Sequence, residues 1–448
     1  MRNGNWFAGG EALFTVAKHV ICPRVLCRYQ EAMRVLRISD EELAAINWNK
    51  RLRIVRYAYE NVPYYRRVFK EKGLDDPRDI RCEEDWAQLP ILRREDVVAS
   101  FHSLMSVPVN RKYLVPTSTG GTTGEPLKLY RDSRFPSKVF QWRALHLCGL
   151  HPGVDEACMS RVPTRQNFVQ RIKQYPTRRI VLDTSSLSES DIVRFMEEYN
   201  RVKPRLIRGY PAAIAHIAQF IEAHGVAVHS PEAIWVTSAP ITQVQKAVIE
   251  RVFGAPVYDQ YGSCEIHWIA QQCEIREGLH INNDIVHLEV VGSSGLPCKA
   301  DIEGSVLVTD LENYVFPLIR YKNGDLGKVL DKRCSCGVTL PLMAPIKGRI
   351  SDVVRLPDGG IITGEFLTTV FDPFPDAVRA FQILQKKDYS LILCVVLNAD
   401  HSCASQQVEW VASILRAKAR NQMTVTVNVV SDIPGDLVKT RYVVSELG

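Results

Sequence analysis

The chain has 448 residues, of which 46% are hydrophobic and 24% are charged, and its formal net charge is +6 at pH 7. This composition is typical of a folded globular protein and excludes a disordered or fibrous chain. The positive charge is modest and lacks a dense Lys/Arg block, so the sequence argues against nucleic-acid binding. The length exceeds what one hydrophobic core usually supports, which predicts a large body with at least one smaller unit.

The sequence favours a protein with no membrane span and no secretory leader. The longest apolar stretch near the start, residues 6–27, is interrupted by Glu11, Lys18 and Arg24, so it lacks the run of about 20 apolar residues that a spanning helix needs. No small-residue cleavage site follows it. Twelve cysteines in such a chain are read as reduced thiols with one metal site. We therefore expect a cytoplasmic protein, and the sequence leaves open a homodimer.

Local patterns predict an α/β fold. The first 100 residues read as helical, with Ser39 and Glu42 in capping-box positions and apolar residues at helical spacing after them. From residue 113 onward, short apolar runs alternate with amphipathic stretches at residues 191–199 and 241–253. Strands rich in branched apolar residues are expected at residues 234–237, 287–291 and 305–309.

The pattern changes after residue 352 and predicts a separate small unit. Two apolar runs at residues 381–384 and 391–397 are followed by a helical stretch at residues 406–420 and an alternating strand around Val427. We therefore expect two domains. They are a large N-terminal body over residues 1–351, with its binding site after residue 113, and a small α+β domain over residues 352–448.

The most informative segment covers residues 116–128 and reads PTSTGGTTGEPLK. Glycines let a backbone turn its N–H groups toward phosphate oxygens, and hydroxyls add neutral donors around them. No Lys-Ser or Lys-Thr pair follows at the offset of a Walker A loop. From composition alone, a flexible surface loop is the alternative. The candidate phosphate-binding residues are Ser118, Thr119, Gly120, Gly121, Thr122, Thr123 and Gly124.

The order of these residues resembles the ATP-phosphate loop of the adenylate-forming superfamily, the acyl-CoA synthetases and their relatives. The resemblance implies an aromatic-Gly-x-x-Glu turn downstream, which Tyr261-Gly262-Ser263-Cys264-Glu265 matches. Glu265 then corresponds to the family's magnesium-linked carboxylate, which can hold the ion that accompanies ATP. The segment Ser238-Ala239-Pro240 resembles the one whose backbone faces the adenine in relatives.

Two further motifs follow in the family's order. Tyr321-Lys322-Asn323-Gly324-Asp325 resembles the Tyr-x-x-Gly-Asp motif, in which Asp325 would accept both ribose hydroxyls. Gly348-Arg349 and Ser351-Asp352 resemble the hinge segment, where Arg349 would reach the nucleotide and Asp352 would mark the pivot of a mobile C-terminal lid. A lone Asp or Arg reads as a surface residue, so the weight of these assignments comes from motif order.

The resemblance also implies a lysine in the lid, and Lys439 in the segment at residues 432–441 is the candidate. A positioned ammonium can stabilise the charge that spreads over oxygens when a carboxylate displaces pyrophosphate from ATP. The sequence departs from the family's form, because Val438 stands where a glycine usually precedes the lysine. A solvated lysine near the C-terminus is the alternative. The candidate catalytic residues are thus Lys439, Glu265 and Thr123.

Thiols and imidazoles after the Tyr261 turn suggest a structural zinc site. Cys334 and Cys336 form a tight pair, and Cys273 and His280 supply a third thiol and an imidazole. Thiolates and imidazole suit tetrahedral Zn²⁺, and four protein ligands leave no open position. Cys264, His267 and His287 are competing donors, and unmetallated thiols are the alternative. Similar placements occur in the phenylacetate-CoA ligase branch.

The segments AYENVPYY, at residues 58–65, and LPIL, at residues 89–92, resemble the opening of phenylacetate-CoA ligases and capsule-biosynthesis proteins. The resemblance implies an AMP-forming ligase that uses ATP and Mg²⁺, makes an acyl-adenylate from an aryl or hydrophobic acid, and passes the acyl group to coenzyme A. An amide ligase, an adenylyltransferase and a non-catalytic nucleotide-binding relative are the alternatives. Candidate residues for the acid pocket are Phe140, Tyr210, Trp235, Gln260 and Trp268.

Overall fold

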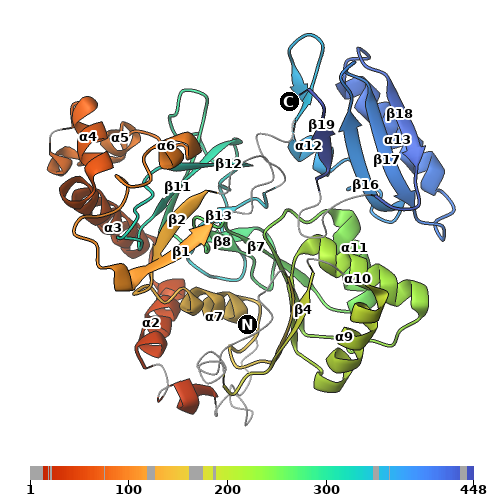
Figure 1. The fold of residues 1–448 in the computed structure, drawn as a ribbon, viewed down its shortest axis with the longest axis horizontal. Coiled ribbons are helices and arrows are strands. Elements are labelled where there is room, and N and C mark those ends of the chain that lie inside the picture. The colour runs from red at the N-terminus through yellow and green to blue at the C-terminus, as the bar shows by residue number, and fades with distance from the viewer. Residues whose placement is uncertain are drawn as a thin grey trace. The chain divides into compact units, whose positions relative to one another are not determined.

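The computed structural model describes residues 14–18, 20, 23–74, 76–118, 127–160, 175–184, 188–346, 353–362, 364–433 and 441–447. The chain divides into two compact units (Figure 1). The first unit consists mainly of Lys18–Gly149 and Gln260–Pro345, and the second of Arg2–Ala17, Leu150–Asp259 and Ile346–Gly448. Within the described parts, no helix is both long and apolar enough to cross a bilayer.

The first unit opens with helices, as the sequence predicts. Ser39 caps the longest of them, because its hydroxyl accepts a hydrogen bond from the backbone N–H of Glu42 at 3.2 Å. Pro63 begins the next helix at a position where its missing N–H costs nothing. The helices of this unit are α2 (Pro23–Arg34), α3 (Asp40–Asn61), α4 (Pro63–Glu71), α5 (Glu83–Ala87), α6 (Arg94–Ala99) and α7 (Lys138–Leu147).

Three sets of antiparallel strands complete this unit. The hairpin of β1 (Leu114–Ser118) and β2 (Lys128–Asp132) follows the helices. A meander contains β10 (Val286–Val291), β11 (Gly304–Asp310) and β12 (Tyr321–Gly327). The third set pairs the end of β7 (Val257–Tyr261) with β8 (Ala270–Gln271), β8 with β9 (Leu279–Ile281), and β9 with β13 (Leu342–Met343).

A buried polar network fastens the segment after β9 to its surroundings. Arg143 of α7 is fully buried and binds both carboxylate oxygens of Asp284 at 2.9 Å. Asn282 donates its side-chain amide to Gln271 at 2.7 Å and to the carbonyl of Trp268 at 3.2 Å. Bidentate charged pairs and fully bonded amides are costly to break once buried, so this network fixes the strands that flank the candidate site.

The second unit contains a parallel sheet in the order β6–β5–β3–β4, with helices connecting its strands. The strands are β3 (Glu156–Ser160), β4 (Arg179–Asp183), β5 (Leu206–Gly209) and β6 (Ala233–Thr237), and the helices are α9 (Glu189–Val202), α10 (Pro211–His224) and α11 (Gln243–Phe253). Branched residues that alternate along the strands, such as Ile207 and Ile234, meet the apolar stripes of these helices in one core. Figure 1 shows the three helices on the same face of the sheet.

The C-terminal part of the second unit has its own four-stranded sheet, in the order β18–β17–β16–β19. Strands β16 (Val378–Gln385) and β17 (Leu391–Leu397) are antiparallel, and β18 (Val425–Val429) pairs parallel to β17 after the crossover helix α13 (Ala404–Lys418). The short elements are β14 (Val354–Arg355), β15 (Ile361–Ile362), α12 (Gly364–Thr368) and β19 (Val443–Ser445). The predicted strands at residues 381–384 and 391–397, the helix at residues 406–420 and the strand around Val427 are β16, β17, α13 and β18. The sequence did not predict β14, β15 and α12, which precede them, or β19, which pairs with β16.

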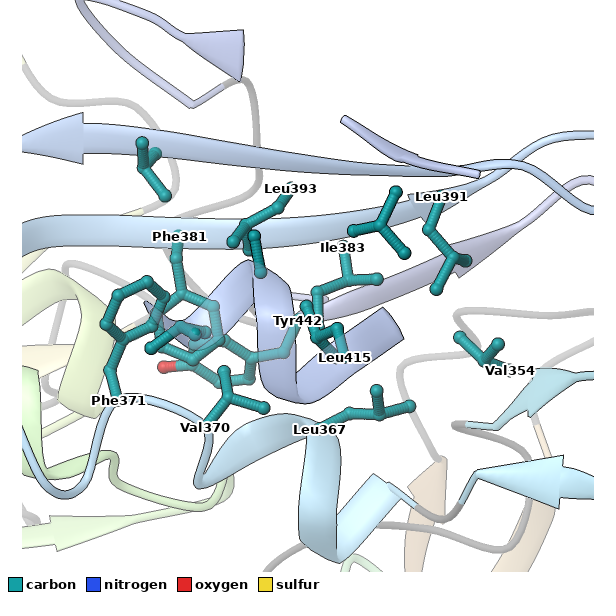
Figure 2. Packing of buried hydrophobic residues seen from close by; sticks show 14 of the residues in the cluster. Val354, Leu367, Val370, Phe371, Phe381, Ile383, Leu391, Leu393, Leu415 and Tyr442 are labelled. Carbon is teal, nitrogen blue, oxygen red and sulfur yellow. The ribbon is translucent and has the colours of Figure 1, made fainter. Parts of the chain in front are cut away.

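The core of this C-terminal part lies between its sheet and its helices (Figure 2). Leu391, Leu393 and Val395 are fully buried at alternate positions of β17, as one face of a strand requires. Leu415 of α13 packs into the same cluster. Val244 of α11 also belongs to this cluster, so the parallel-sheet region and the C-terminal sheet share apolar contacts.

The α/β fold class that the sequence predicts is confirmed, since the structure mixes parallel and antiparallel sheets with helices in the expected order. The helices expected at residues 191–199 and 241–253 are α9 and α11. The division into a body ending at residue 351 and a mobile lid stays a prediction.

We expect Leu393→Ala to lower the free energy of unfolding by about 2–5 kcal/mol, because it removes a fully buried side chain from the C-terminal core and leaves a cavity. The matched control is Val429→Ala on β18, where the side chain is 57% exposed and the change should stay within about 0.5 kcal/mol. Chemical denaturation followed by circular dichroism measures both. Equal shifts in the two variants would contradict this description of the core.

Candidate functional site

The β1–β2 hairpin flanks residues 118–124, which we call the Gly/Thr-rich string. The two strands are antiparallel, and Ser118 at the end of β1 pairs with Lys128 at the start of β2. The hairpin therefore holds Ser118 and Lys128 side by side, with Ser118 exposed. Six other predicted phosphate-binding residues lie outside the described residues: Thr119, Gly120, Gly121, Thr122, Thr123 and Gly124.

A compact turn between β7 and β8 carries Glu265. The N–H of Ser263 donates to the carbonyl of Ile266 at 2.8 Å, and the N–H of Ile266 donates to the Ser263 hydroxyl at 3.0 Å. Gly262 has to be glycine, because a Cβ atom at this position would lie 1.9 Å from the carbonyl oxygen of His267. The turn holds the Glu265 carboxylate in a buried position, with only 8% of the residue exposed.

Two tyrosine hydroxyls form hydrogen bonds that connect this turn to β12. Tyr261, which precedes the turn, donates to Oδ2 of Asp325 on β12 at 2.8 Å. Tyr321, which begins β12, donates to Oε1 of Glu265 at 3.1 Å. We call these four residues the crossed tyrosine–carboxylate pairs. Each tyrosine binds the carboxylate that belongs to the other motif.

The backbone and the amide of β12 complete this arrangement. The side chain of Asn323 donates to Asp325 at 2.9 Å and to the hydroxyl of Tyr261 at 2.5 Å. Gly324 has a φ angle of +88°, which L side chains rarely adopt, and this explains the glycine of the motif. Three predicted residues, Tyr261, Glu265 and Asp325, therefore take part in hydrogen bonds that join the turn to β12.

The Tyr321 hydroxyl that donates to Glu265 stays protonated. Burial is the largest cause that raises the pKa of Tyr321 well above its usual value, and the charge and hydrogen bond of Glu265 add to it. The phenol therefore keeps its proton at every physiological pH and can only act as a donor toward the carboxylate. A buried carboxylate needs such donors, because leaving it unpaired away from water costs several kcal/mol.

The other predicted nucleotide-site residues belong to the second unit or lie outside the described residues. Ser238 follows β6 in the second unit, is exposed, and has a φ angle of +74°, which is uncommon for a residue other than glycine. Ala239 and Pro240 are half-buried beside it. Arg349, the hinge residue Asp352 and the lid residue Lys439 are not among the described residues.

The four predicted zinc ligands gather in the first unit. The ligand atoms of Cys273, His280, Cys334 and Cys336 all lie within 4.8 Å of one another. The two sulfur atoms of Cys273 and Cys334 are 3.6 Å apart, and Sγ of Cys336 is 3.3 Å from Nε2 of His280. The competing donor His267 instead contacts Arg131, and His287 lies beside Arg51.

The surroundings of this group suit a metal ion. Nδ1 of His280 lies 3.1 Å from the carbonyl oxygen of Leu340, so this nitrogen carries the proton and Nε2 presents its lone pair toward the thiols. Burial lowers the pKa of His280 and keeps the imidazole neutral, as a ligand must be. Burial raises the pKa of Cys336 to about 12, which favours the protonated thiol, so a metal ion would have to displace that proton on binding.

The five candidate residues for an acid pocket have structural contacts. Phe140 stacks on Phe135 with ring centroids 5.3 Å apart. Gln260 donates to the carbonyls of Tyr261 and His267 at 2.8 Å and so supports the Glu265 turn. Trp235 is buried in β6, Tyr210 precedes α10, and Trp268 is half-buried after the turn. Their role in substrate binding stays a prediction.

Sequence reasoning missed two residues that bind the carboxylates of Glu265 and Asp325. Tyr321 and Asn323 lie inside a quoted motif, but nothing in one sequence indicates that their side chains bind Glu265 and Asp325. Their partners are up to 62 positions away along the chain, between Asn323 and Tyr261. The available signal is position: Tyr321, Asn323 and Asp325 occupy every second position of β12, so their side chains share one face of the strand.

The chain is similar in sequence to proteins of known name. The family model described as the CapK C-terminal domain matches residues 354–446. A phenylacetate-coenzyme A ligase of Thermus thermophilus is 27% identical over 378 residues, covering 81% of this chain and 82% of that relative. The protein CapK of Staphylococcus aureus is 23% identical over 399 residues, covering 83% and 82%.

The fold also matches solved structures. A crystal structure of 2-hydroxyisobutyryl-CoA ligase in the postadenylation state superposes with a TM-score of 0.77 at 19% identity, covering 92% of this chain and 91% of that one. At this level of identity the likeness establishes the fold, and the chemistry has to be argued from the residues.

We expect Gly262→Ala to lower the free energy of unfolding by about 1–3 kcal/mol, since the added methyl group overlaps a backbone carbonyl that cannot move freely. Gly292→Ala is the control, because a Cβ there would only touch Sγ of Cys298 at 3.8 Å. Chemical denaturation gives the stabilities, and hydrogen exchange of the amides at residues 262–268 tests whether the turn itself loosens. Unchanged exchange in Gly262→Ala would contradict the close approach.

Proposed function

We propose that this chain, which belongs to the adenylate-forming superfamily in its phenylacetate-CoA ligase and CapK branch, is an ATP-dependent, AMP-forming acid–thiol ligase. The single observation that carries the proposal is the set of crossed tyrosine–carboxylate pairs. They bind Glu265 and Asp325, the two buried carboxylates that would serve the ion and the ribose, between the same two segments. The curated relatives that include phenylacetate-coenzyme A ligases support the same chemistry.

ATP would bind to the motifs that the sequence predicts. The string at residues 118–124 would surround the phosphates with backbone N–H groups and hydroxyls, among them Thr123. Asp325 would accept both ribose hydroxyls through its ionised oxygens, one of which already accepts from Tyr261. The segment Ser238–Pro240 would face the adenine and Arg349 would reach the nucleotide.

Glu265 fits the role of a magnesium ligand. It is a buried carboxylate with Oε1 bound by Tyr321, and hard oxygen donors are what Mg²⁺ takes from proteins. Mg²⁺ bound there would neutralise charge on the phosphates during transfer. The chain's own contribution is to fix the direction of this carboxylate.

The first half-reaction joins the acid to AMP. A carboxylate oxygen of the acid forms a bond to the α-phosphorus, the bond to the bridging oxygen breaks, and pyrophosphate leaves with that electron pair. Lys439 would donate to the oxygens on which negative charge develops. Residues 352–448 would act as a lid that brings this lysine to the site and pivots at Asp352.

The second half-reaction transfers the acyl group to a thiol, for which we propose coenzyme A. The thiol loses its proton, its sulfur attacks the acyl carbon, and AMP leaves with the electrons of the broken carbon–oxygen bond. The named substrates of the relatives and the aromatic residues Phe140 and Trp268 support an aryl or hydrophobic acid.

We also propose a structural Zn²⁺ held by Cys273, His280, Cys334 and Cys336. The donor set fits the ion, since three thiols and one neutral imidazole gather with Nε2 of His280 facing them. Four protein ligands leave no position for substrate, so the ion would fasten the segments after β8, at β9 and before β13 without entering the reaction.

Acid-dependent exchange of labelled pyrophosphate into ATP tests the proposed adenylation. We expect one acid of a panel of aryl, aliphatic and amino acids to support exchange, and coenzyme A then to release AMP. Lys439→Ala should lower the exchange rate about 10²-fold, because a positioned donor contributes roughly that much. Lys387→Ala, an exposed lysine of the C-terminal part, is the control.

The outcomes separate the alternatives. Exchange without an effect of coenzyme A would point to an amide ligase, and a stable adenylyl adduct seen by mass spectrometry would point to an adenylyltransferase. ATP binding with no turnover, together with no effect of Lys439→Ala or Thr123→Ala, would point to a non-catalytic nucleotide-binding protein. Each of these results would overturn the proposed ligase.

Elemental analysis of carefully purified protein tests the metal. We expect about one Zn²⁺ per chain, as a closed four-ligand site binds one ion. Cys334→Ser should reduce the zinc content, whereas Cys403→Ser, which changes an exposed free thiol, should not. Purified protein without zinc would end this proposal.

A further inference from the structure

The turn that carries Glu265 is held from outside by two side chains on separate strands. One is Tyr321 of β12, whose hydroxyl donates to the Glu265 carboxylate at 3.1 Å. The other is Arg131 of β2, whose guanidinium donates to the carbonyl oxygen of Cys264, the residue just before Glu265. Arg131 thus reaches the turn from the hairpin that frames the Gly/Thr-rich string.

Backbone hydrogen bonds and burial together restrain the position of the Tyr321 hydroxyl. The N–H of Leu92 donates to the carbonyl of Arg320 at 3.2 Å, and the carbonyl of Leu92 accepts from Lys322 at 2.9 Å, so both neighbours of Tyr321 are pinned. Arg320 is itself anchored, because its buried guanidinium binds Glu289 at 3.0 Å. With only 2% of the residue exposed, Tyr321 has little room for another orientation.

Arg131 is equally constrained at its charged end. Besides the Cys264 carbonyl, its guanidinium contacts Nδ1 of His267 at the far side of the same turn. Nδ1 of His267 can accept this hydrogen bond in the tautomer that carries its proton on Nε2. Arg131 thus bridges both halves of the turn.

The contacts of Arg131 and of Tyr321 restrain different parts of the turn. Arg131 restrains the backbone of the turn through Cys264 and His267, whereas Tyr321 restrains the rotation of the Glu265 carboxylate by occupying Oε1. A carboxylate with one oxygen bound presents the other oxygen in a single direction. Groups that orient a metal ligand in this way commonly change metal affinity 10–100-fold when they are removed.

We infer that Tyr321 and Arg131 are positioning residues that orient Glu265 toward the metal ion of the nucleotide complex. The inference rests on the proposed function, because it assumes that Glu265 binds the ion that accompanies ATP. Neither side chain touches the reacting atoms in this account. Their effect should therefore be confined to the part of ATP affinity that depends on the metal.

Binding of ATP with and without the metal tests this directly. The dissociation constant of ATP is measured by calorimetry in EDTA and again with saturating Mg²⁺, and the ratio of the two values gives the metal-dependent gain in affinity. We expect Tyr321→Phe to lower this gain about tenfold while leaving the affinity in EDTA unchanged. Arg131→Met should also lower the gain, and Arg131→Lys, which keeps one charged donor, should lower it less.

Tyr199→Phe provides a matched control. Tyr199 is another buried tyrosine, its hydroxyl donates to the carbonyl of His229 at 3.0 Å, and it lies in the second unit. Its loss should reduce stability as the loss of any buried hydrogen bond does, without changing the metal-dependent gain. A structural defect would weaken ATP binding in EDTA and in Mg²⁺ alike, which distinguishes it from lost positioning.

Glu265→Gln separates the failure of this inference from the failure of the proposed function. If Glu265→Gln abolishes the metal-dependent gain but Tyr321→Phe and both Arg131 variants keep it, the positioning role is overturned and the role of Glu265 stands. If Glu265→Gln itself keeps the gain, the assignment of the metal ligand is wrong and the inference falls with it. Should Tyr321→Phe fail to fold, Arg131→Lys and Arg131→Met still decide the question.

Discussion

Two buried tyrosine hydroxyls and two buried carboxylates form the constraint on which the candidate site depends. Tyr261 and Glu265 belong to one turn, while Tyr321 and Asp325 belong to one strand, and the hydrogen bonds run across. A shift of either segment would break hydrogen bonds made by buried hydroxyls and carboxylates, which are costly to lose away from water. The crossed hydrogen bonds therefore join the two motifs, as the proposed nucleotide site would require.

The rest of the first unit supports this pair of segments from several sides. The buried network of Arg143, Asp284 and Asn282 holds the strands that follow the turn. The group of three cysteines and His280 joins the segment after β8 to the loop before β13. These polar clusters are buried and mutually bonded, so they specify a geometry that apolar packing alone would leave less sharply defined.

The second unit is organised around apolar cores and a parallel sheet. Its parallel sheet is buried by helices on one face, and backbone groups at the carboxyl ends of such strands are where ligands commonly bind in α/β folds. Ser238 follows the carboxyl end of β6 with a left-handed backbone, a conformation that costs free energy and so marks a place where geometry matters. The C-terminal sheet has its own apolar core, yet it includes Val244 of α11, so the two sheets of this unit are in contact through that helix.

The sequence by itself determined several helices and strands, such as α9, α11 and β17, because apolar periodicity and capping are local, and the family, because five motifs stand in a fixed order. It also indicated the four metal-ligand candidates, which the fold then gathered within 4.8 Å. Only the tertiary structure decided that Tyr321 binds Glu265, 56 positions away, and that Arg131 reaches the same turn. Such contacts depend on how distant strands pack, and a side chain's partner across a fold leaves no periodic trace in one sequence.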